Sequence, residues 1–555
     1  MTNFRIKHVF AGLFLICAIS VSGDLLAQKS GKGSYFVRFS DKNNTPYSLN
    51  APLKFLSQRS LDRRAKHAAP LTAEDLPVNP SYVDSLRAKG ARIMFTSRWF
   101  NAATVAVDTD IVMIEIAKLP FVKGYEKVYR KKTPNTKTID NDNELLRRTN
   151  YGTSSKQITM LNGDYLHQKG FKGQGELIAV LDGGFYRVDK LEAFSYLRDN
   201  HRILAMHNFV TGKDSVYNDA THGMMVLSSM GGQLSGKLVG TAPEASYILL
   251  ESENTSSEYP IEEDAWVAAA EFADSAGADV INSSLGYTKF DDPTMSHTYA
   301  DMNGHTNRSS VGANIAFSKG ILVVCSAGND GANSWHYISS PADGDSVLAV
   351  GAVDDMEKAA SFSSYGPSFD GDVKPNVAAM GVETVVASTT DGETTTVSGT
   401  SLSSPILCGV ATSLMSAFPD KTNNEIKNVI QKSAHLYPNS DPQMGYGIPD
   451  FKLAYEMLSL TKNEKSDDFK LLELYPNPYS NDVIISLYTK NESKIFITMY
   501  DNLGRTIFHK EYTSSKNNVD KMSLGVTPDL NPGVYTLLIN SNNWTLKKKL
   551  VKSKQ

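Results

Sequence analysis

Short apolar runs alternate with longer stretches of helical periodicity through the middle of the chain. The runs Glu176–Asp182, Ile321–Ser326 and Val347–Val353 have the length and the mostly apolar character of strands that are buried on both faces. Amphipathic stretches separate such runs, as at Glu262–Ala276. Strands that alternate with helices in this way predict an α/β fold with a doubly wound, mostly parallel sheet, which we place at residues 156–460.

Different patterns flank this central domain. Between residues 34 and 129 the order strand, helix, strand, strand, helix, strand predicts a small α+β unit, which a basic helical insertion around Arg59–Lys66 enlarges. From residue 471 onward, short alternating runs broken by Asn502-Leu-Gly504 and Asn531-Pro-Gly533 predict a small β-sandwich.

The first residues have the pattern of a signal peptide. Arg5 and Lys7 precede the apolar stretch Val9–Val21, and a cleavage site is expected after Ala27. Export is therefore expected, and no transmembrane span is predicted in the mature chain. The expected order of segments is a signal peptide at 1–27, the α+β unit at 28–132, an exposed linker with the processing site at 133–155, the central domain at 156–460, a second linker at 461–470 and the β-sandwich at 471–555.

Composition and charge narrow the functional classes. The 555 residues are 41% hydrophobic, which is enough for a large core without disulfide bonds. The net charge of −4 gives no global basic footprint, so nucleic acid is not expected as a partner. Cys325 and Cys408 lie within apolar runs, which predicts two buried thiols rather than a disulfide.

Four polar residues lie where apolar runs begin or end. Asp182 ends a predicted strand ahead of two glycines, Asn329 follows another strand on a glycine loop, and His222 begins an apolar helical run. Ser401 lies between Gly399 and the apolar run that follows. A serine attacks a carbonyl when a base takes its proton and a third group orients that base, so this set suits acyl chemistry. Each residue alone also fits a structural role, as a loop cap, a turn residue, a helix-start residue or an N-cap.

The order acid, histidine, serine, with the words around each residue, resembles the subtilisin-like serine peptidases, or subtilases. The similarity covers about residues 156–460 and includes Asn282–Gly286, which is similar to the family's substrate-pairing strand. The resemblance implies protein or peptide substrates and assigns Ser401 as nucleophile, His222 as base, Asp182 as the residue that orients the base and Asn329 as oxyanion donor. It also implies that substrate binds at Ser284, Leu285, Gly286, Ala327 and Gly328.

The flanking units carry resemblances of their own. The N-terminal unit resembles a subtilase propeptide, which templates folding of the protease and blocks its cleft until it is cut. The C-terminal sandwich, with Pro476-Asn-Pro478, Asp501–Arg505 and Pro532–Tyr535, resembles the sorting domain of the type IX secretion system of Bacteroidota. This implies the secretion machinery as a partner and a secreted or outer-surface location. A carbohydrate-binding or merely stabilising sandwich is the alternative.

Three segments depart from the family's pattern. Gly183 follows the acid where threonine or serine is usual, Met224 and Met225 stand where threonine and a second histidine are common, and Lys374 replaces a common aspartate. The departures at Gly183 and Met224 leave open the alternative that the chain is a catalytically silent surface protein that binds peptides or acts as a scaffold. A metallohydrolase ranks last, because the chain has no His-Glu-x-x-His string.

We therefore expect a secreted serine endopeptidase that is made as a self-processed preproprotein. The resemblance implies no cofactor for catalysis. Subtilases often hold structural calcium, but no segment of the sequence identifies its ligands.

Overall fold

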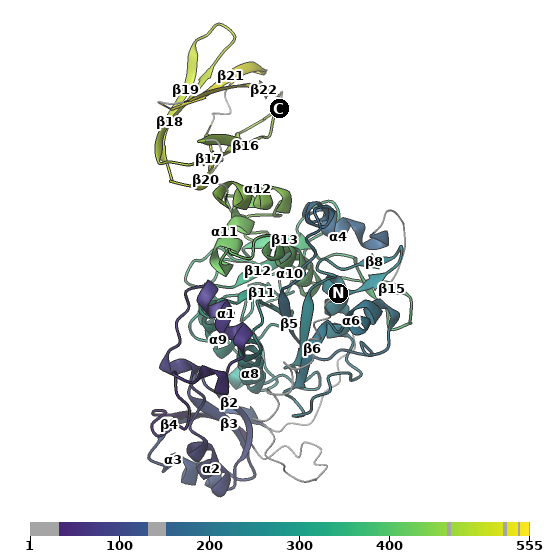
Figure 1. The fold of residues 1–555 in the computed structure, drawn as a ribbon, viewed down its shortest axis with the longest axis vertical. Helices are drawn as coiled ribbons and strands as arrows, with labels where there is room; N and C mark the ends of the chain where they lie inside the picture. The colour runs from purple at the N-terminus through teal and green to yellow at the C-terminus, as the bar shows by residue number, and fades with distance from the viewer. Residues whose placement is uncertain (1–32, 131–150, 463–467, 526–529, 542–543, 554–555) are drawn as a thin grey trace, which may run out of the picture.

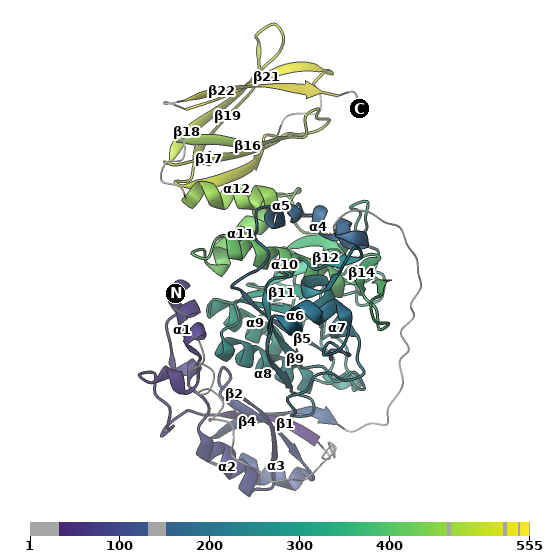
Figure 2. The same cartoon turned by 45° about the vertical axis from the view of Figure 1, so that its right-hand side comes forward.

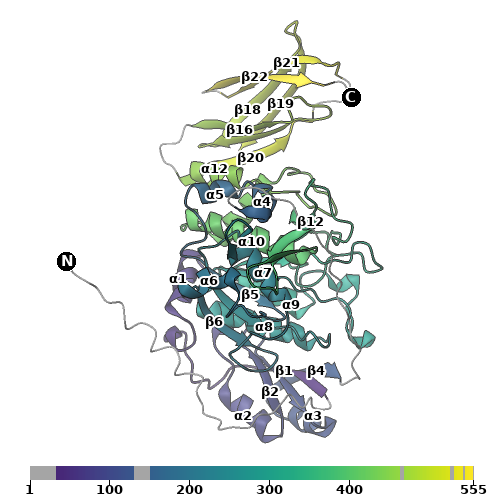
Figure 3. The ribbon, with the colours of Figure 1, turned by 90° about the vertical axis from the view of Figure 1, so that its right-hand side faces the viewer.

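The computed structural model describes residues 33–130, 151–462, 468–525, 530–541 and 544–553. These residues form three units arranged along the long axis of the molecule, with the N-terminal unit and the C-terminal sandwich at opposite ends of the central domain (Figure 1). The views in Figure 2 and Figure 3 keep this order. No helix among the described residues is long and apolar enough to cross a membrane.

The N-terminal unit is the predicted α+β arrangement. Its antiparallel sheet has the order β2-β3-β1-β4, and α2 and α3 pack on one face of it. The other face turns towards helix α8 (Ile261–Ala276) of the central domain, where Thr104 Oγ1 donates to Asp264 at 2.8 Å. The elements are β1 (Gly33–Phe39), α1 (Gln58–Lys66), α2 (Pro80–Ala88), β2 (Arg92–Ser97), β3 (Ala102–Val107), α3 (Asp110–Ala117) and β4 (Val122–Arg130).

The central domain is built on a seven-stranded sheet of order β13-β12-β11-β10-β5-β9-β6, in which every pairing is parallel. The doubly wound parallel sheet predicted from the sequence is confirmed. Helices α7 (His222–Gly231) and α10 (Thr400–Ala417) share one core with the sheet. Helices α8 and α9 (Arg308–Ser318) share a second core on the other face. The strands are β5 (Leu177–Asp182), β6 (Ile203–Asn208), β9 (Ser246–Glu251), β10 (Val280–Ser283), β11 (Leu322–Ser326), β12 (Leu348–Val353) and β13 (Val377–Met380).

The helices of this domain vary widely in length. Helix α10 runs for 18 residues, and all of its residues through Met415 are buried. Cys325 and Cys408 are both buried and free, as predicted. The helices are α4 (Ser155–Thr159), α5 (Asp164–Gln168), α6 (Ser195–Asp199), α7 (His222–Gly231), α8 (Ile261–Ala276), α9 (Arg308–Ser318), α10 (Thr400–Ala417), α11 (Asn423–Ser433) and α12 (Phe451–Lys462), and two short hairpins pair β7 (Gln233–Leu234) with β8 (Leu238–Val239) and β14 (Thr384–Ala387) with β15 (Thr394–Val397).

The C-terminal unit is a sandwich of two antiparallel sheets, as predicted, of orders β16-β17-β20 and β19-β18-β21-β22. It stands on α12 (Figure 2), and Tyr488 and Val519 join the core of the central domain. Lys521 Nζ donates to the carbonyl of Ala434 at 3.0 Å across the same junction. The strands are β16 (Phe469–Tyr475), β17 (Ile484–Thr489), β18 (Ser493–Tyr500), β19 (Thr506–Ser514), β20 (Asn518–Ser523), β21 (Gly533–Asn540) and β22 (Thr545–Lys552).

Both expected linkers are shorter than the sequence suggests. Helix α12 continues past residue 460, and β16 begins inside the expected linker 461–470. At the end of the expected linker 133–155, Ser154 is 1% exposed and its hydroxyl accepts from the amide of Val239 at 3.1 Å. Exposure was predicted wrongly there, because these backbone and hydroxyl groups find partners in the central domain. The signal peptide and most of residues 133–155 lie outside the described residues.

Candidate active site

Three adjacent strands of the sheet end at the same edge and bring the candidate residues together. Asp182 is the last residue of β5, and Asn329 lies in the loop that follows β11. Strand β10 lies between these two strands and leads directly into Ser284. Helix α7 begins at His222, and Ser401 is the second residue of α10. The carboxyl edge of a parallel sheet is where ligands bind in such folds.

Asp182 and His222 form a hydrogen-bonded pair. The Asp182 Oδ1 to His222 Nδ1 distance is 2.8 Å, and the amide of Gly183 donates to the same oxygen at 2.7 Å. Because a carboxylate only accepts, Nδ1 of His222 donates, and Nε2 of the neutral ring is left as an acceptor. A Cβ atom at Gly223 would lie 2.9 Å from Asp182 Cβ and 2.5 Å from the carbonyl oxygen of Gly184, so glycine is needed for this approach.

The surroundings of His222 favour its protonated form. Desolvation by the protein lowers the pKa of His222, but the charge of Asp182, its hydrogen bond and the charge of Glu253 outweigh this and raise the pKa above 6.5. The imidazole side chain remains 40% exposed, while the Asp182 side chain is fully buried. The ring can therefore reach a substrate while its orientation stays fixed.

Ser401 and Asn329 face a common space. The Oδ1 of Asn329 accepts from the amide and the hydroxyl of Thr400 at 2.8 and 2.9 Å, which leaves the Nδ2 group to point elsewhere. A Cβ atom at Gly399 would lie 2.9 Å from Ser401 Oγ and 3.6 Å from Asn329 Nδ2. Ser401 is 8% exposed, and Ser284 Oγ donates to its carbonyl at 2.8 Å. The Ser401 hydroxyl and the Asn329 amide group thus lie beside the same point next to Gly399.

The structure does not hold these residues as one continuous hydrogen-bonded row: Asp182 is bonded to His222, while Asn329 is bonded to Thr400, the neighbour of Ser401. Among the described residues, no hydrogen bond joins Ser401 Oγ to His222 Nε2, although each pair lies at the same edge of the sheet. Such bonds between a nucleophile and its base are often long before substrate binds.

The segment Ser284-Leu285-Gly286 follows β10 at the same edge of the sheet, and Gly286 lies against Ser339. Ser284 and Leu285 are 7% and 8% exposed, and Gly286 is exposed. A Cβ atom at Gly286 would lie 2.3 Å from the hydroxyl of Ser339, and a Cβ atom at Gly328 would lie 3.2 Å from it. That hydroxyl is buried and makes no hydrogen bond within the described chain. Sequence analysis missed Ser339, since only the fold brings it between these two glycines.

Ala327 is fully buried, and its amide donates to the carbonyl of Val350 at 3.0 Å, so it shapes the site from below.

Lys374, one of the residues that depart from the family's sequence pattern, is also buried, and its Nζ donates to the carbonyls of Gly344 and Val347. Burial lowers the pKa of Lys374 to about 8. Met224 packs in the domain core. Both departures therefore lie in the protein's packing.

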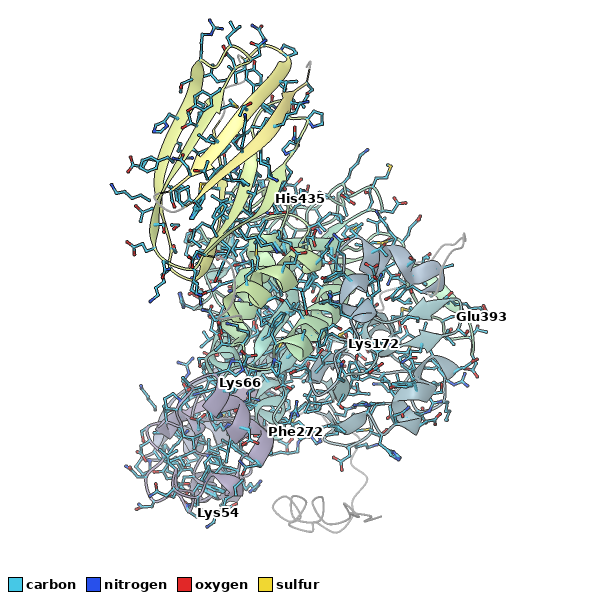
Figure 4. The ribbon with its side chains drawn as sticks, turned by 45° about the horizontal axis from the view of Figure 1, so that its top comes forward. Lys54, Lys66, Lys172, Phe272, Glu393 and His435 are labelled. Carbon is cyan, nitrogen blue, oxygen red and sulfur yellow. The ribbon has the colours of Figure 1, made fainter. Side chains whose placement is uncertain are left out.

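The N-terminal unit covers helix α8 through buried ion pairs. Arg63, Arg64 and Arg98 all reach Asp274, whose side chain is fully buried. Glu271 accepts from the hydroxyl of Ser97 at 2.6 Å and from the amide of Arg98 at 2.9 Å. Figure 4 shows Lys66, at the end of α1, beside the central domain. This unit is thus docked on the domain that carries the candidate site.

Comparison with known families gives one consistent picture. The model of the subtilase family matches residues 173–447. That of the peptidase S8 propeptide domain of Bacteroidota matches residues 34–144, and that of the secretion system C-terminal sorting domain matches residues 473–553. The first and third matches lie within the central domain and the C-terminal unit, and the second spans the N-terminal unit and runs on to residue 144.

Individual proteins agree with the family matches. A thermostable alkaline protease of Halalkalibacterium halodurans is 30% identical over 57% of this chain and 77% of the relative. Subtilisin DY of Bacillus licheniformis is 30% identical over 50% of this chain and 90% of the relative. Among solved structures, the MycP3 protease from the type VII (ESX-3) secretion system is 22% identical over 55% of this chain and 89% of that chain, with a TM-score of 0.43.

Proposed function

Because the chain belongs to the subtilase family and is a secreted serine endopeptidase with a propeptide, we propose that Asp182, His222 and Ser401 form its catalytic triad and that Asn329 stabilises the oxyanion. The observation that carries this assignment is the meeting of two pairs at one sheet edge, Asp182 bound to His222 and Ser401 facing the same space as Asn329. The catalytically silent alternative is not favoured.

The roles follow from the atoms that each residue presents. Ser401 Oγ attacks the peptide carbonyl while Nε2 of His222 takes its proton, and Asp182 stabilises the imidazolium through Nδ1. The carbonyl oxygen becomes an oxyanion, which accepts from Asn329 Nδ2 and from the amide of Ser401. His222 then returns the proton to the leaving amine, an ester to Ser401 remains, and water repeats the sequence to release the acid.

Substrate binding uses the backbone beside the triad. An extended peptide pairs with Ser284, Leu285 and Gly286 as an added strand, which leaves its side chains free for pockets. One side chain enters between Gly286 and Gly328, where the Ser339 hydroxyl is available as a polar partner. No cofactor takes part in these steps.

The flanking units account for the secretion and the processing of the chain. The C-terminal sorting domain directs type IX secretion to the cell surface or the extracellular space. We assign residues 28–132 to the propeptide, place self-cleavage within residues 133–155, and assign residues 471–555 to the sorting domain, with the secretion machinery as its partner. Removal of the signal peptide, residues 1–27, comes first.

Replacement of two residues tests the assignment. Ser401→Ala is expected to lower kcat/KM on an unfolded protein by at least about 10⁴-fold and to leave the full chain unprocessed. Ser403→Ala is the matched control, because its buried hydroxyl donates to the carbonyl of Thr400 within the same helix, at 3.0 Å. Asn329→Asp keeps the acceptor for Thr400 but removes the amide donor, and should cost at least about 10²-fold in kcat. Unchanged hydrolysis by Ser401→Ala would refute the nucleophile.

A further inference from the structure

Helix α1 lies across the amino ends of β5, β10 and β11, the three adjacent strands whose carboxyl ends lead to the candidate site. Figure 2 shows this helix against the central domain and apart from the sheet of its own unit. Arg59 and Arg63 of α1 donate to four backbone carbonyls that directly precede these strands. The acceptors are Gly175 and Gly277 for Arg59, at 2.7 and 3.0 Å, and Ala278 and Lys319 for Arg63, at 2.6 and 3.2 Å.

Two carboxylates of the central domain complete this surface. Asp279 pairs with Arg59, and the fully buried Asp274 pairs with Arg63 and Arg64. The first amide of β5 donates to the same oxygen of Asp279 at 2.9 Å, which fixes the orientation of that carboxylate. A planar guanidinium group can donate to a carboxylate and to carbonyls at the same time, whereas an ammonium group acts as a point charge. The surface therefore recognises arginine and not only positive charge.

The backbone of the central domain comes close to α1 at two glycines. A Cβ atom at Gly277 would lie 2.7 Å from Arg59 Cβ, and one at Gly320 would lie 2.8 Å from the Cδ2 atom of His67. The amide of Asn423 donates to Nδ1 of His67 at 3.0 Å, just beyond the end of the helix. The three arginines occupy positions i, i+4 and i+5 and so lie within about 140° around the helix axis. The surface thus fits one side of a helix as well as its charges.

Processing removes the present occupant of this surface. Helix α1 belongs to the segment that matches the propeptide domain, so departure of the propeptide uncovers Asp274, Asp279 and the four carbonyls. A second helix that carries arginines at the same spacing can form the same hydrogen bonds. Lys319, at the border of the surface, pairs with Glu74 and Asp75 of the propeptide. Acidic residues that follow the arginines in a partner would pair with this lysine in the same way.

We infer that the mature peptidase uses this surface as an exosite, a docking site away from the cleft, for arginine-bearing helices of its protein substrates. The three strands have four to six residues, so their two ends are about 13–20 Å apart. An unfolded connection of about 15 residues spans up to roughly 50 Å and can run around the domain from the docked helix to the cleft. Docking raises the local concentration of the substrate at the cleft, which lowers KM and leaves kcat unchanged.

Binding is tested in the full chain with Ser401→Ala, which needs neither catalysis nor processing. Arg63→Ala and Arg64→Ala in this chain give a vacated chain, whose surface is free of its own arginines. The probe is a fluorescent peptide with the sequence of residues 51–70, followed by anisotropy. It should bind the vacated chain at least about tenfold more tightly than the Ser401→Ala parent, where tethered α1 competes at a millimolar effective concentration. Adding Asp274→Asn to the vacated chain should weaken binding at least about tenfold.

Two controls separate recognition of arginine from general attraction. Asp355→Asn removes an exposed carboxylate just beyond the carboxyl end of β12 and should leave binding by the vacated chain unchanged. A peptide with Arg63→Lys and Arg64→Lys keeps its charge and should bind at least about fivefold more weakly. Circular dichroism checks that each chain is folded. The inference is overturned if the folded vacated chain binds the probe no better than the parent, or if Asp274→Asn has no effect.

The self-processed wild-type enzyme gives a second measurement that needs no arginine variant of the chain. An unfolded protein substrate carries residues 51–70 at one end, joined by about 15 glycine and serine residues, and its counterpart has alanine at both arginine positions. The arginine form should show a KM at least about fivefold lower at equal kcat, and Asp274→Asn in the enzyme should remove the difference. Equal KM values for the two substrates, or competitive inhibition of a short peptide substrate by the free 51–70 peptide, would overturn the inference.

Discussion

Asp274 is the residue on which docking of the propeptide depends most. Its carboxylate lies 2.7 Å from Arg64 and 2.5 Å from Arg98, and it also contacts Arg63. The side chains of Arg63, Arg64 and Arg98 are 1%, 3% and 8% exposed, respectively. All of these partners belong to the propeptide, so Asp274→Asn should disturb docking and leave the mature peptidase intact.

The size of the effect follows from the burial of these charges. Removing one partner of a buried ion pair costs about 3–5 kcal/mol, because the remaining charges stay buried and uncompensated. Arg64 also forms an ion pair with Asp75, so the free-energy cost of losing Asp274 is smaller for this arginine than for the other two. At about 1.4 kcal/mol per factor of ten, the population of undocked propeptide should rise by roughly 10²–10³·⁵.

Hydrogen exchange of the unprocessed Ser401→Ala chain measures this population. The amides of α1 are the best probe, because this helix contacts α8 and contributes nothing to the core of the propeptide sheet. Their exchange should accelerate by the same factor in Asp274→Asn. Asp84→Asn removes an exposed pair with Arg87 and should change it less than about fivefold. Equal protection of α1 in Asp274→Asn and its parent would refute the reasoning.

Three further outcomes are expected. The proposed base, His222, must be unprotonated to take a proton, and its pKa is raised. kcat/KM should therefore increase with pH through a midpoint above 6.5, and a midpoint below 6 would contradict this. Lys374→Met removes charged hydrogen bonds to two buried carbonyls and should lower the free energy of unfolding by about 1.5–3 kcal/mol in urea titrations, whereas an unchanged midpoint would speak against a structural role. Val519→Asp places a charge in the junction between the sandwich and the central domain, so limited proteolysis should release the sandwich faster than from the parent chain. Equal rates of release would show that Val519 does not stabilise this junction.

The strands that carry the candidate site were predictable because their signal is local. Strand β5 is buried along its whole length, so its apolar run continues without a break up to its last residue, Asp182. The edge strand β6 escaped prediction, because five of its six residues are at least partly exposed and its apolar pattern is weak. The opposite edge strand, β13, has only four residues.

Other features of the site have no local signature. The hydroxyl of Ser339 lies close to Gly286 and Gly328. Neither glycine is a neighbour of Ser339 in the sequence, so only the fold brings the three residues together. Asp274 likewise meets arginines that lie more than 170 residues away along the chain. Contacts of this kind follow from the relative placement of whole units, which patterns of single segments do not encode.

Helix α8 explains how one propeptide can be both specific and removable. Its buried face presents Asp264, Glu271 and Asp274 to the propeptide. Burial raises the pKa of Asp264 and of Glu271, which means that these carboxylates lose hydration when they are covered. The Coulomb attraction of a buried ion pair is largely offset by such desolvation, so the net affinity of the interface stays moderate, while any wrongly charged partner leaves buried charges unpaired. Once the connecting chain is cut, rehydration of this acidic face favours departure of the propeptide.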